Sequence, residues 1–158
     1  MRRIALLGLV VLVLALVGVA GVSAAPAEAP RCSFYPVQGF GTLWFTGERI
    51  ANLLGCPTSR EYGVDVVERR FQYGQGIWFS DSNTVFILTN DGSVWPFANA
   101  GSVVWVYNNY PWVRARLGYP TEDNRYVTAS WEDFQRGAMY WTHKSGRIVF
   151  FQGWWERY

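Results

Sequence analysis

One pattern occurs twice in this 158-residue chain at a constant spacing, and this repetition constrains the fold more than any other feature. Residues 54–58 read Leu-Gly-Cys-Pro-Thr, and residues 117–121 read Leu-Gly-Tyr-Pro-Thr. In the same register, Phe-Gln-Tyr-Gly at 71–74 recurs as Phe-Gln-Arg-Gly at 134–137, and each copy continues to a Trp. We interpret the chain as two copies of one small unit. A unit this small cannot bury its own apolar face, so the two copies must pack together.

Each copy combines helical spacing with strand patterns. In the first copy, apolar residues between Leu43 and Leu54 fall at helical spacing, and Gly55 stands where a helix would stop. In the second copy, Pro111 opens a helix that Gly118 ends. Strands are predicted over 74–79, 84–88 and 94–97, and again over 139–142 and 148–151. The predicted fold is α+β and β-dominant, with two tandem units, each a short helix, a Leu-Gly-x-Pro turn and a β-hairpin or meander.

Residues 1–25 have the composition of an export signal. Arg2 and Arg3 precede an apolar or glycine stretch over 4–22, and the small residues that follow predict cleavage after residue 24. The apolar stretch is also long enough for an uncleaved membrane anchor, which stays as the alternative. We expect a short tether at 26–31 and one compact domain at 32–158, made of two repeats (about 35–98 and 99–158). The protein is therefore predicted to be secreted or held at the bacterial cell surface.

The charge balance argues against two classes of partner. The full chain has 14 basic and 12 acidic residues, and without Arg2 and Arg3 the two numbers are equal. Proteins that bind nucleic acids or anionic membranes carry an excess of basic residues. We therefore expect neither nucleic acid nor, after signal cleavage, a membrane as the partner.

Cys32 and Cys56 are the two cysteines of a chain expected to be exported, so a disulfide between them is the default interpretation. The bond would join the start of the domain to the first Leu-Gly-x-Pro turn. A catalytic thiol is the rival interpretation, with His143, the one histidine, as its base. Nothing in the sequence brings a cysteine and His143 together, so we favour the disulfide.

The sequence contains no evident catalytic or metal-binding pattern. Glu132 and Asp133 are adjacent, so on a strand they would point to opposite faces, and Glu68 is their nearest counterpart in the first copy. A glycosidase needs two carboxylates that converge at about 5–9.5 Å, and solvated loop charges are the simpler interpretation here. One His and two Cys do not build a usual zinc site, and no calcium-binding loop occurs. We expect no enzyme activity, no metal and no cofactor.

Aromatic residues are abundant, with nine Trp, nine Tyr and ten Phe. Those matched between the copies, Phe71 with Phe134 and Trp78 with Trp141, are expected to pack in the core. The unmatched tryptophans are candidates for a ligand surface, because duplication of the scaffold does not require them. The candidates are Trp95, Trp105, Trp112, Trp131, Trp154 and Trp155. Their rings could stack on the C–H faces of sugars, and packing in a small β-rich core is the competing interpretation.

The compound motif resembles the LGFP repeat. The second copy, over 117–122 and 134–141, matches it well, and the first copy, over 54–59 and 71–78, departs from it where Cys56 replaces an aromatic residue. Such repeats occur in exported bacterial proteins, often beside cell-wall enzymes, and are associated with attachment to envelope polysaccharide. The resemblance implies a non-catalytic module that binds bacterial cell-envelope polysaccharide. The alternatives are an exported module that binds an envelope protein or has a structural role and, in third place, a small cell-wall hydrolase.

Overall fold

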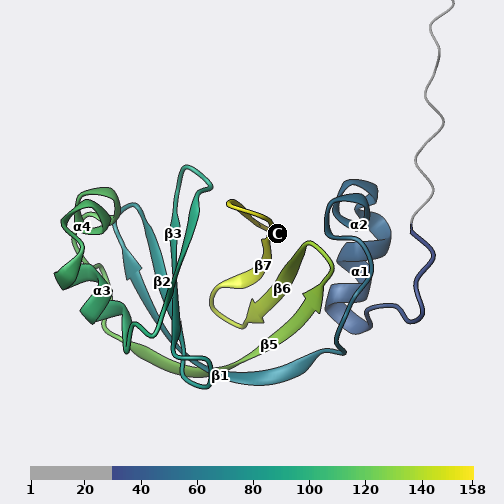
Figure 1. Cartoon of the computed structure of the whole chain (residues 1–158), viewed down its shortest axis with the longest axis horizontal. Coiled ribbons are helices and arrows are strands. Elements are labelled where there is room, and N and C mark those ends of the chain that lie inside the picture. The colour runs from purple at the N-terminus through teal and green to yellow at the C-terminus, as the bar shows by residue number, and fades with distance from the viewer. Residues whose placement is uncertain (1–29) are drawn as a thin grey trace, which may run out of the picture.

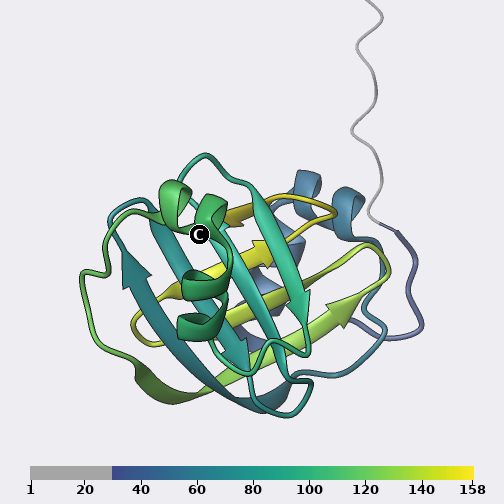
Figure 2. The same ribbon diagram turned by 60° about the vertical axis from the view of Figure 1, so that its left-hand side comes forward.

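An antiparallel sheet of eight strands curls around a central core, and two pairs of short helices lie on its outer side (Figure 1, Figure 2). These numbers refer to residues 30–158, the part of the chain that the computed structural model describes. The strand order is β4-β3-β2-β1-β5-β6-β7-β8. The helices are α1 (Gln38–Thr46), α2 (Glu48–Leu54), α3 (Val103–Asn109) and α4 (Pro111–Leu117), and the strands are β1 (Tyr62–Phe71), β2 (Gly74–Phe79), β3 (Thr84–Thr89), β4 (Val94–Ala98), β5 (Arg125–Phe134), β6 (Gly137–Thr142), β7 (Gly146–Phe150) and β8 (Trp155–Arg157).

The two longest strands, β1 and β5, pair at the middle of the sheet. Their register places Asp65 opposite Thr128, and the Thr128 hydroxyl donates a hydrogen bond to Asp65 Oδ1 at 2.8 Å. Thr128 lies 63 positions after Asp65, which is also the spacing between the two copies of the motif. The pairing of β1 with β5 is therefore pseudo-symmetric, because every residue pair on one side of Asp65 has a counterpart on the other side.

The two edge strands approach each other at one end, so the sheet is nearly closed. The Val94 amide donates to the Gly153 carbonyl at 3.3 Å, and the Trp155 amide donates to the Gly92 carbonyl at 2.8 Å. Apolar side chains from both halves of the chain fill the inside of the curl: Val66, Ile77, Phe79, Leu88, Val94, Ala129, Ala138, Tyr140, Ile148 and Phe150. Neither half of the chain forms this central core by itself.

Each helix pair packs on the strands of the other half of the chain. Helices α1 and α2 share a buried core with β6 and β7, which includes Trp44, Met139 and Val149. Helices α3 and α4 share a second buried core with β1 and β3, which includes Val106 and Ile87. Figure 1 shows the two helix pairs on opposite outer sides of the sheet. The helices of each half of the chain therefore complete a core with strands of the other half.

Hydrogen bonds between the copies explain the repeated motif. The Gln72 amide donates to the Tyr119 carbonyl, and the Gln135 amide donates to the Cys56 carbonyl, both at 3.0 Å. In return, the Tyr119 amide donates to Gln72 Oε1 at 3.0 Å, and the Cys56 amide donates to Gln135 Oε1 at 3.1 Å. Each Leu-Gly-x-Pro-Thr turn therefore binds the Phe-Gln-x-Gly turn of the other copy. In each case the side-chain carbonyl oxygen of the motif Gln accepts the hydrogen bond from the turn.

The motif glycines Gly55 and Gly118 suit this contact for two reasons. Their φ angles are 73° and 70°, in the left-handed region that favours glycine. A Cβ on Gly55 would lie 2.5 Å from Gln135 Oε1, and a Cβ on Gly118 would lie 2.6 Å from Gln72 Oε1. Any larger residue at either position would have to push the Gln side chain away from the turn.

The β-dominant α+β class predicted from the sequence is confirmed. Helix α4 begins at Pro111 and ends before Gly118, as predicted. The predicted helix that ends at Leu54 is instead two helices, because the chain bends at Gly47. A Cβ on Gly47 would lie 2.9 Å from the Leu43 carbonyl oxygen, so this bend requires glycine.

Helix α3 and strands β1, β5 and β8 are not predicted by the sequence patterns above. Helix α3 is rich in β-branched and aromatic residues, which are typical of strands. It forms a helix because the Ser102 side chain caps it, accepting a hydrogen bond from the Trp105 amide at 3.0 Å. Strand β8 has three residues and owes its conformation to its pairing with β7.

Of the four aromatic residues matched between the copies, two are buried as predicted, one packs at the edge of a core, and one is exposed. Phe71 and Phe134 are buried. Trp78 is half-buried, and the Trp141 side chain is 41% exposed. Trp78 packs against the core of α3 and α4, so the prediction of core packing is wrong for Trp141.

The position of Trp141 explains its exposure. Tyr140 points into the central core, so the next side chain along the strand, Trp141, points to the outer face of the sheet. Its neighbours across β5 and β7 are Ser130 and Arg147, which provide no apolar cover.

The structure contains the predicted disulfide between Cys32 and Cys56. It joins the segment before α1 to the turn after α2. No helix within residues 30–158 is long and apolar enough to span a membrane. The predicted export signal at 1–25 lies outside the described residues.

Candidate functional site

Three of the six candidate tryptophans meet in one cluster of rings, which we call the aromatic patch: Trp95, Phe97, Trp105, Tyr110 and Trp112. The ring centroids of Trp95 and Trp112 are 5.5 Å apart, and those of Phe97 and Trp112 are 5.9 Å apart. Phe97 also contacts Tyr110 at 4.8 Å, and Tyr110 contacts Trp105 at 6.0 Å. The five rings therefore form a continuous aromatic surface over β4, α3 and α4.

Local structure places these rings on one side of the molecule. On the edge strand β4, Trp95 and Phe97 alternate with Pro96, so their side chains project to the same face. A proline is tolerated there because an edge strand does not need every amide hydrogen. Pro111 starts helix α4, which places Trp112 in the first turn of this helix, beside β4.

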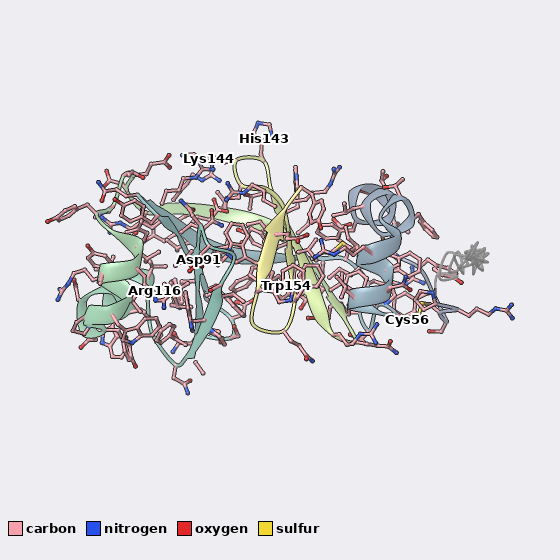
Figure 3. The ribbon with its side chains drawn as sticks, turned by 90° about the horizontal axis from the view of Figure 1, so that it is seen from above. Cys56, Asp91, Arg116, His143, Lys144 and Trp154 are labelled. Carbon is pink, nitrogen blue, oxygen red and sulfur yellow. A yellow bond between two sulfur atoms is a disulfide. The ribbon has the colours of Figure 1, made fainter. Side chains whose placement is uncertain are left out.

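The aromatic patch is partly open to solvent and has charged groups at its rim. Trp105 is 46% exposed and Trp112 is 41% exposed. The Arg116 guanidinium lies over Trp95, with Cζ 4.9 Å from the ring centroid. It also pairs with Asp91, whose Oδ2 is 3.3 Å from Arg116 Nη1 (Figure 3). A ligand on the patch would therefore meet apolar ring faces beside a hydrogen-bond donor and an acceptor.

Asp91 is held in its ionised form by the turn between β3 and β4. The Thr89 hydroxyl donates to Asp91 Oδ1 at 2.5 Å, and the Ser93 amide donates to the same oxygen at 2.9 Å. These hydrogen bonds, with a smaller contribution from the charge of Arg116, keep the pKa of Asp91 below its ordinary value. Asp91 therefore anchors Arg116 at neutral pH and holds its guanidinium next to the rings.

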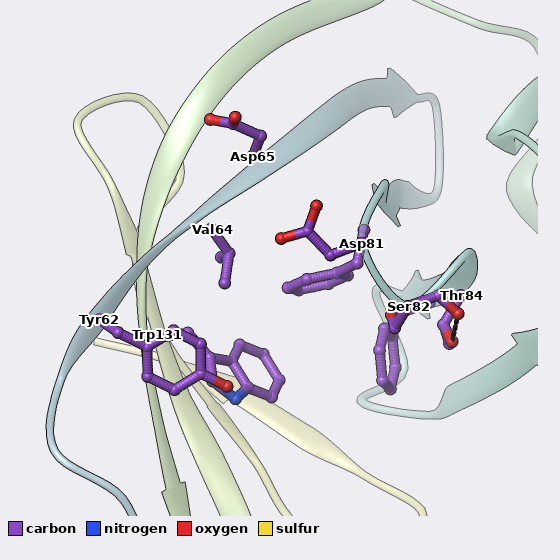
Figure 4. A pocket seen from close by; sticks show the side chains of 9 residues that line it. Tyr62, Val64, Asp65, Asp81, Ser82, Thr84 and Trp131 are labelled. Carbon is purple, nitrogen blue, oxygen red and sulfur yellow. Dashed lines mark hydrogen bonds between the residues drawn. The ribbon is translucent and has the colours of Figure 1, made fainter.

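Trp131, the fourth candidate, lies apart from the patch in a cavity of about 290 Å³ at one open end of the curled sheet. Phe79, Phe86 and Trp131 supply its apolar lining, with ring centroids 5.0 Å apart for Phe79 and Trp131. Asp65 and Asp81 add carboxylates. Figure 4 shows Tyr62 and Trp131 on one side of the cavity and Asp81, Ser82 and Thr84 on the other.

This cavity has a pseudo-symmetric counterpart, formed by residues whose numbers differ from those of the cavity by 63. The counterpart is filled by a polar network around Glu68. Ser145, Tyr140, Thr142 and Arg125 donate to its carboxylate at 2.6, 2.7, 3.0 and 2.6 Å. Glu68, Arg125, Thr142 and Ser145 stand at the positions that correspond to Trp131, Tyr62, Phe79 and Ser82 of the cavity. The two ends of the pseudo-symmetric sheet therefore differ, since only the end at Trp131 is open.

The last two candidates, Trp154 and Trp155, are half-buried at the C-terminal end of the described chain. Trp154 stacks on Phe151 with centroids 3.9 Å apart, and Arg49 lies over its ring at 5.3 Å. The Trp155 indole donates to the Thr89 carbonyl at 3.1 Å, across the gap between the edge strands. Trp155 therefore helps to close the sheet, Trp154 packs against the core of α1 and α2, and neither belongs to the aromatic patch.

The interpretation of Glu68 and Glu132 as solvated loop charges is wrong, because both lie on strands and are buried, 5% and 1% exposed. Burial opposes ionisation of Glu68, but hydrogen bonds from Ser145, Tyr140, Arg125 and Thr142 outweigh it and lower its pKa. Glu68 points into the central core, and Glu132 lies opposite Met139, which faces the helices α1 and α2. The two carboxylates therefore lie on opposite sides of the sheet and do not converge.

Within residues 30–158, no three His, Cys, Asp or Glu residues cluster as metal ligands.

Phe97 and Tyr110 are members of the patch that the sequence interpretation missed. Phe97 could have been found from the alternation Trp-Pro-Phe, which places both rings on one face of a strand. Tyr110 had no such signal, because its contact with Phe97 depends on the unpredicted helix α3.

The fold and the patch define a small β-rich module with a partly exposed aromatic surface. Residues 117–158 match the family model of the LGFP repeat, which confirms the resemblance for this part of the chain. The match begins at Leu117, the first residue of the second Leu-Gly-x-Pro-Thr motif, and covers strands β5 to β8. No curated protein and no solved structure matches the chain.

Proposed function

We propose that this protein is an exported, non-catalytic module that binds bacterial cell-envelope polysaccharide through the aromatic patch. The observation that carries the proposal is the meeting of Trp95, Trp105 and Trp112 with two further rings on one partly exposed face. A sugar ring has an apolar C–H face that stacks on an aromatic ring, and its hydroxyls need hydrogen-bond partners such as Arg116 and Asp91. A contiguous exposed aromatic surface marks an interaction site.

Two further observations support the proposal. The match to the LGFP repeat is consistent with a module associated with the cell envelope. A disulfide in a chain of this size is typical of proteins that fold outside the cytosol. The two-copy organisation (35–98 and 99–158) is part of the same proposal, and the reciprocal hydrogen bonds of Gln72 and Gln135 support it.

The test is retention of the protein on purified cell wall before and after wall proteins are stripped. The described chain should be retained equally on both. Retention lost on stripping would overturn the polysaccharide proposal and favour the second candidate, a module that binds an envelope protein through the same rings.

Variants link retention to the patch. The double substitution Trp105→Ala and Trp112→Ala should lower retention by about tenfold or more, because exposed aromatic anchors dominate binding at such surfaces. The matched control is Trp141→Ala, since Trp141 is as exposed as Trp112 (41% each) but lies outside the patch. An equal loss with Trp141→Ala would show that the patch is not the binding surface.

A further inference from the structure

A buried carboxylate with one oxygen that lacks a hydrogen-bond partner lines a second cavity, on the α1 and α2 side of the molecule. Glu132 is 1% exposed, and its Oε2 atom has no partner among the described residues. The cavity has a volume of about 290 Å³ and is lined by Phe34, Tyr35, Val37, Arg60, Glu61 and Glu132. We call it the Glu132 cavity.

The contrast with Glu68 shows what Glu132 lacks. Glu68 is equally removed from water, and four side chains donate to it, including the Ser145 hydroxyl at 2.6 Å. A buried polar atom left without a partner costs free energy, so most such atoms in proteins are paired. Burial, followed by the charges of Glu61 and Asp133, raises the pKa of Glu132 to about 7. The site therefore favours any ligand that brings a donor or a positive charge.

The walls of the cavity are fixed in place. Phe34, Tyr35 and Val37 follow Cys32 in the chain, and Arg60 and Glu61 follow Cys56, so the disulfide holds both walls at their base. The Tyr35 ring packs on Trp44 and on Phe45, each with a centroid distance of 5.6 Å. Since Tyr35 is 44% exposed, its ring stands at the mouth of the cavity. The cavity is thus preformed, which reduces the free energy needed to order it on binding.

We propose that the Glu132 cavity binds a primary ammonium group, which donates to Glu132 Oε2. An ammonium supplies both the missing donor and a charge that balances the buried carboxylate. Glu61 adds a second negative charge, and the aromatic walls favour a cation over an anion. Arg60 is the one basic residue of the lining, and its side chain is exposed to solvent.

This site is independent of the aromatic patch. The patch lies over α3 and α4, and the Glu132 cavity lies beside α1, on the other side of the curled sheet (Figure 1). Failure of one proposal therefore leaves the other intact. The ammonium could come from an amino sugar of an envelope polymer or from the amine of a peptide, and both share the chemistry proposed here.

The test is a titration of the protein with ethylammonium chloride, with sodium chloride at the same ionic strength as the reference. The readout is the ¹³C NMR signal of the Glu132 carboxyl group. Ethylammonium should bind and lower the pKa of Glu132, and ethanol, its neutral counterpart, should not. Binding should strengthen as the pH rises through about 7. The other titratable or charged groups at the site are Tyr35, Arg60, Glu61 and Asp133.

Substitutions test whether the Glu132 carboxylate is responsible for ethylammonium binding. Glu132→Gln keeps the side-chain shape and should weaken ethylammonium binding by about tenfold or more. Glu122→Gln, which removes a carboxylate outside the cavity, should leave it unchanged. Equal binding by the Glu132→Gln protein and the unaltered protein, or no response of the Glu132 signal to ethylammonium, would overturn the proposal.

Further titrations identify the source of the amine. Glucosamine and lysine amide should each compete with ethylammonium, and the forms in which every amine is acetylated should not. Stronger competition by glucosamine would point to an envelope polymer, and stronger competition by lysine amide would point to a peptide. Competition by the acetylated forms would contradict the ammonium proposal.

Discussion

At the scale of single residues, two buried glutamates show how hydrogen bonding decides the charge of a carboxyl group. Glu68 accepts from Ser145, Tyr140, Thr142 and Arg125, and its pKa is lowered despite burial. Glu132 has an oxygen without a partner, and its pKa is raised to about 7. The sequence could not predict this difference, because the donors to Glu68 come from β5, β6 and the turn after β6, which are distant from Glu68 in the chain.

The raised pKa of Glu132 predicts that stability falls as the pH rises. Its folded pKa of about 7 lies above the ordinary value of 4.5, so its contribution is fully present below 4.5 and is lost as the pH rises through about 7. The expected loss is roughly 3 kcal/mol in the free energy of unfolding. Urea unfolding at pH 5 and pH 8 should show this loss, and Glu132→Gln should remove most of it. An unchanged pH dependence in the Glu132→Gln protein would contradict the account.

At the scale of elements, the turns were predictable and the packing of the helices was not. Pro111 and Gly118 mark the ends of α4 in the sequence, and Gly92, with a φ of 87°, lies in the turn between the strands predicted over 84–88 and 94–97. Helix α3 was missed because its residues favour strands and its helical state depends on the Ser102 cap. The packing of each helix pair on strands from the other half of the chain leaves no trace in local periodicity, because it depends on contacts between distant residues.

The contact between the two motif turns makes a prediction for Gly118. Gly118→Ala should destabilise more than Gly101→Ala, although both residues have a φ near 70°. A Cβ on Gly118 would lie 2.6 Å from Gln72 Oε1, and a Cβ on Gly101 would have no atom within 4 Å. We expect a loss of about 1–2 kcal/mol at Gly101 from backbone strain and about 1 kcal/mol more at Gly118. Thermal unfolding of the two variants measures the difference, and equal losses would show that the Gln72 contact does not stabilise the turn.

At the scale of the whole molecule, each helix pair packs on strands from the other half of the chain. The folding of each half therefore depends on the other half. Fragments 30–98 and 99–158, produced separately, should not unfold cooperatively, because each lacks the helices that cover its strands and half of the central core. Near-ultraviolet circular dichroism on heating provides the measurement, with the intact chain as the control. A cooperative transition in either fragment alone would contradict this view of the fold.

The candidate site was predictable in part at the same scale. Comparison of the two motif copies showed that Trp95, Trp105 and Trp112 have no counterpart in the other copy. The fold brings these three tryptophans together. Trp154 and Trp155 met the same criterion but lie outside the patch: Trp154 stacks on Phe151 beside the core of α1 and α2, and Trp155 bonds Thr89 across the gap between the edge strands. Trp141 occurs at the same position of the motif as Trp78, but this did not predict its burial. A shared position in the motif does not show that the surroundings of a residue are apolar.

The most direct measurement of the central claim is an NMR titration that follows the indole N–H signals of the nine tryptophans. The ligand is solubilised, protein-free cell-wall polysaccharide. We expect the signals of Trp105, Trp112 and Trp95 to shift with a common affinity. The signals of Trp44, 1% exposed, and Trp141, 41% exposed but outside the patch, should stay in place. Shifts at Trp141 without shifts in the patch, or no shift in any indole signal, would contradict the proposal that the aromatic patch binds envelope polysaccharide.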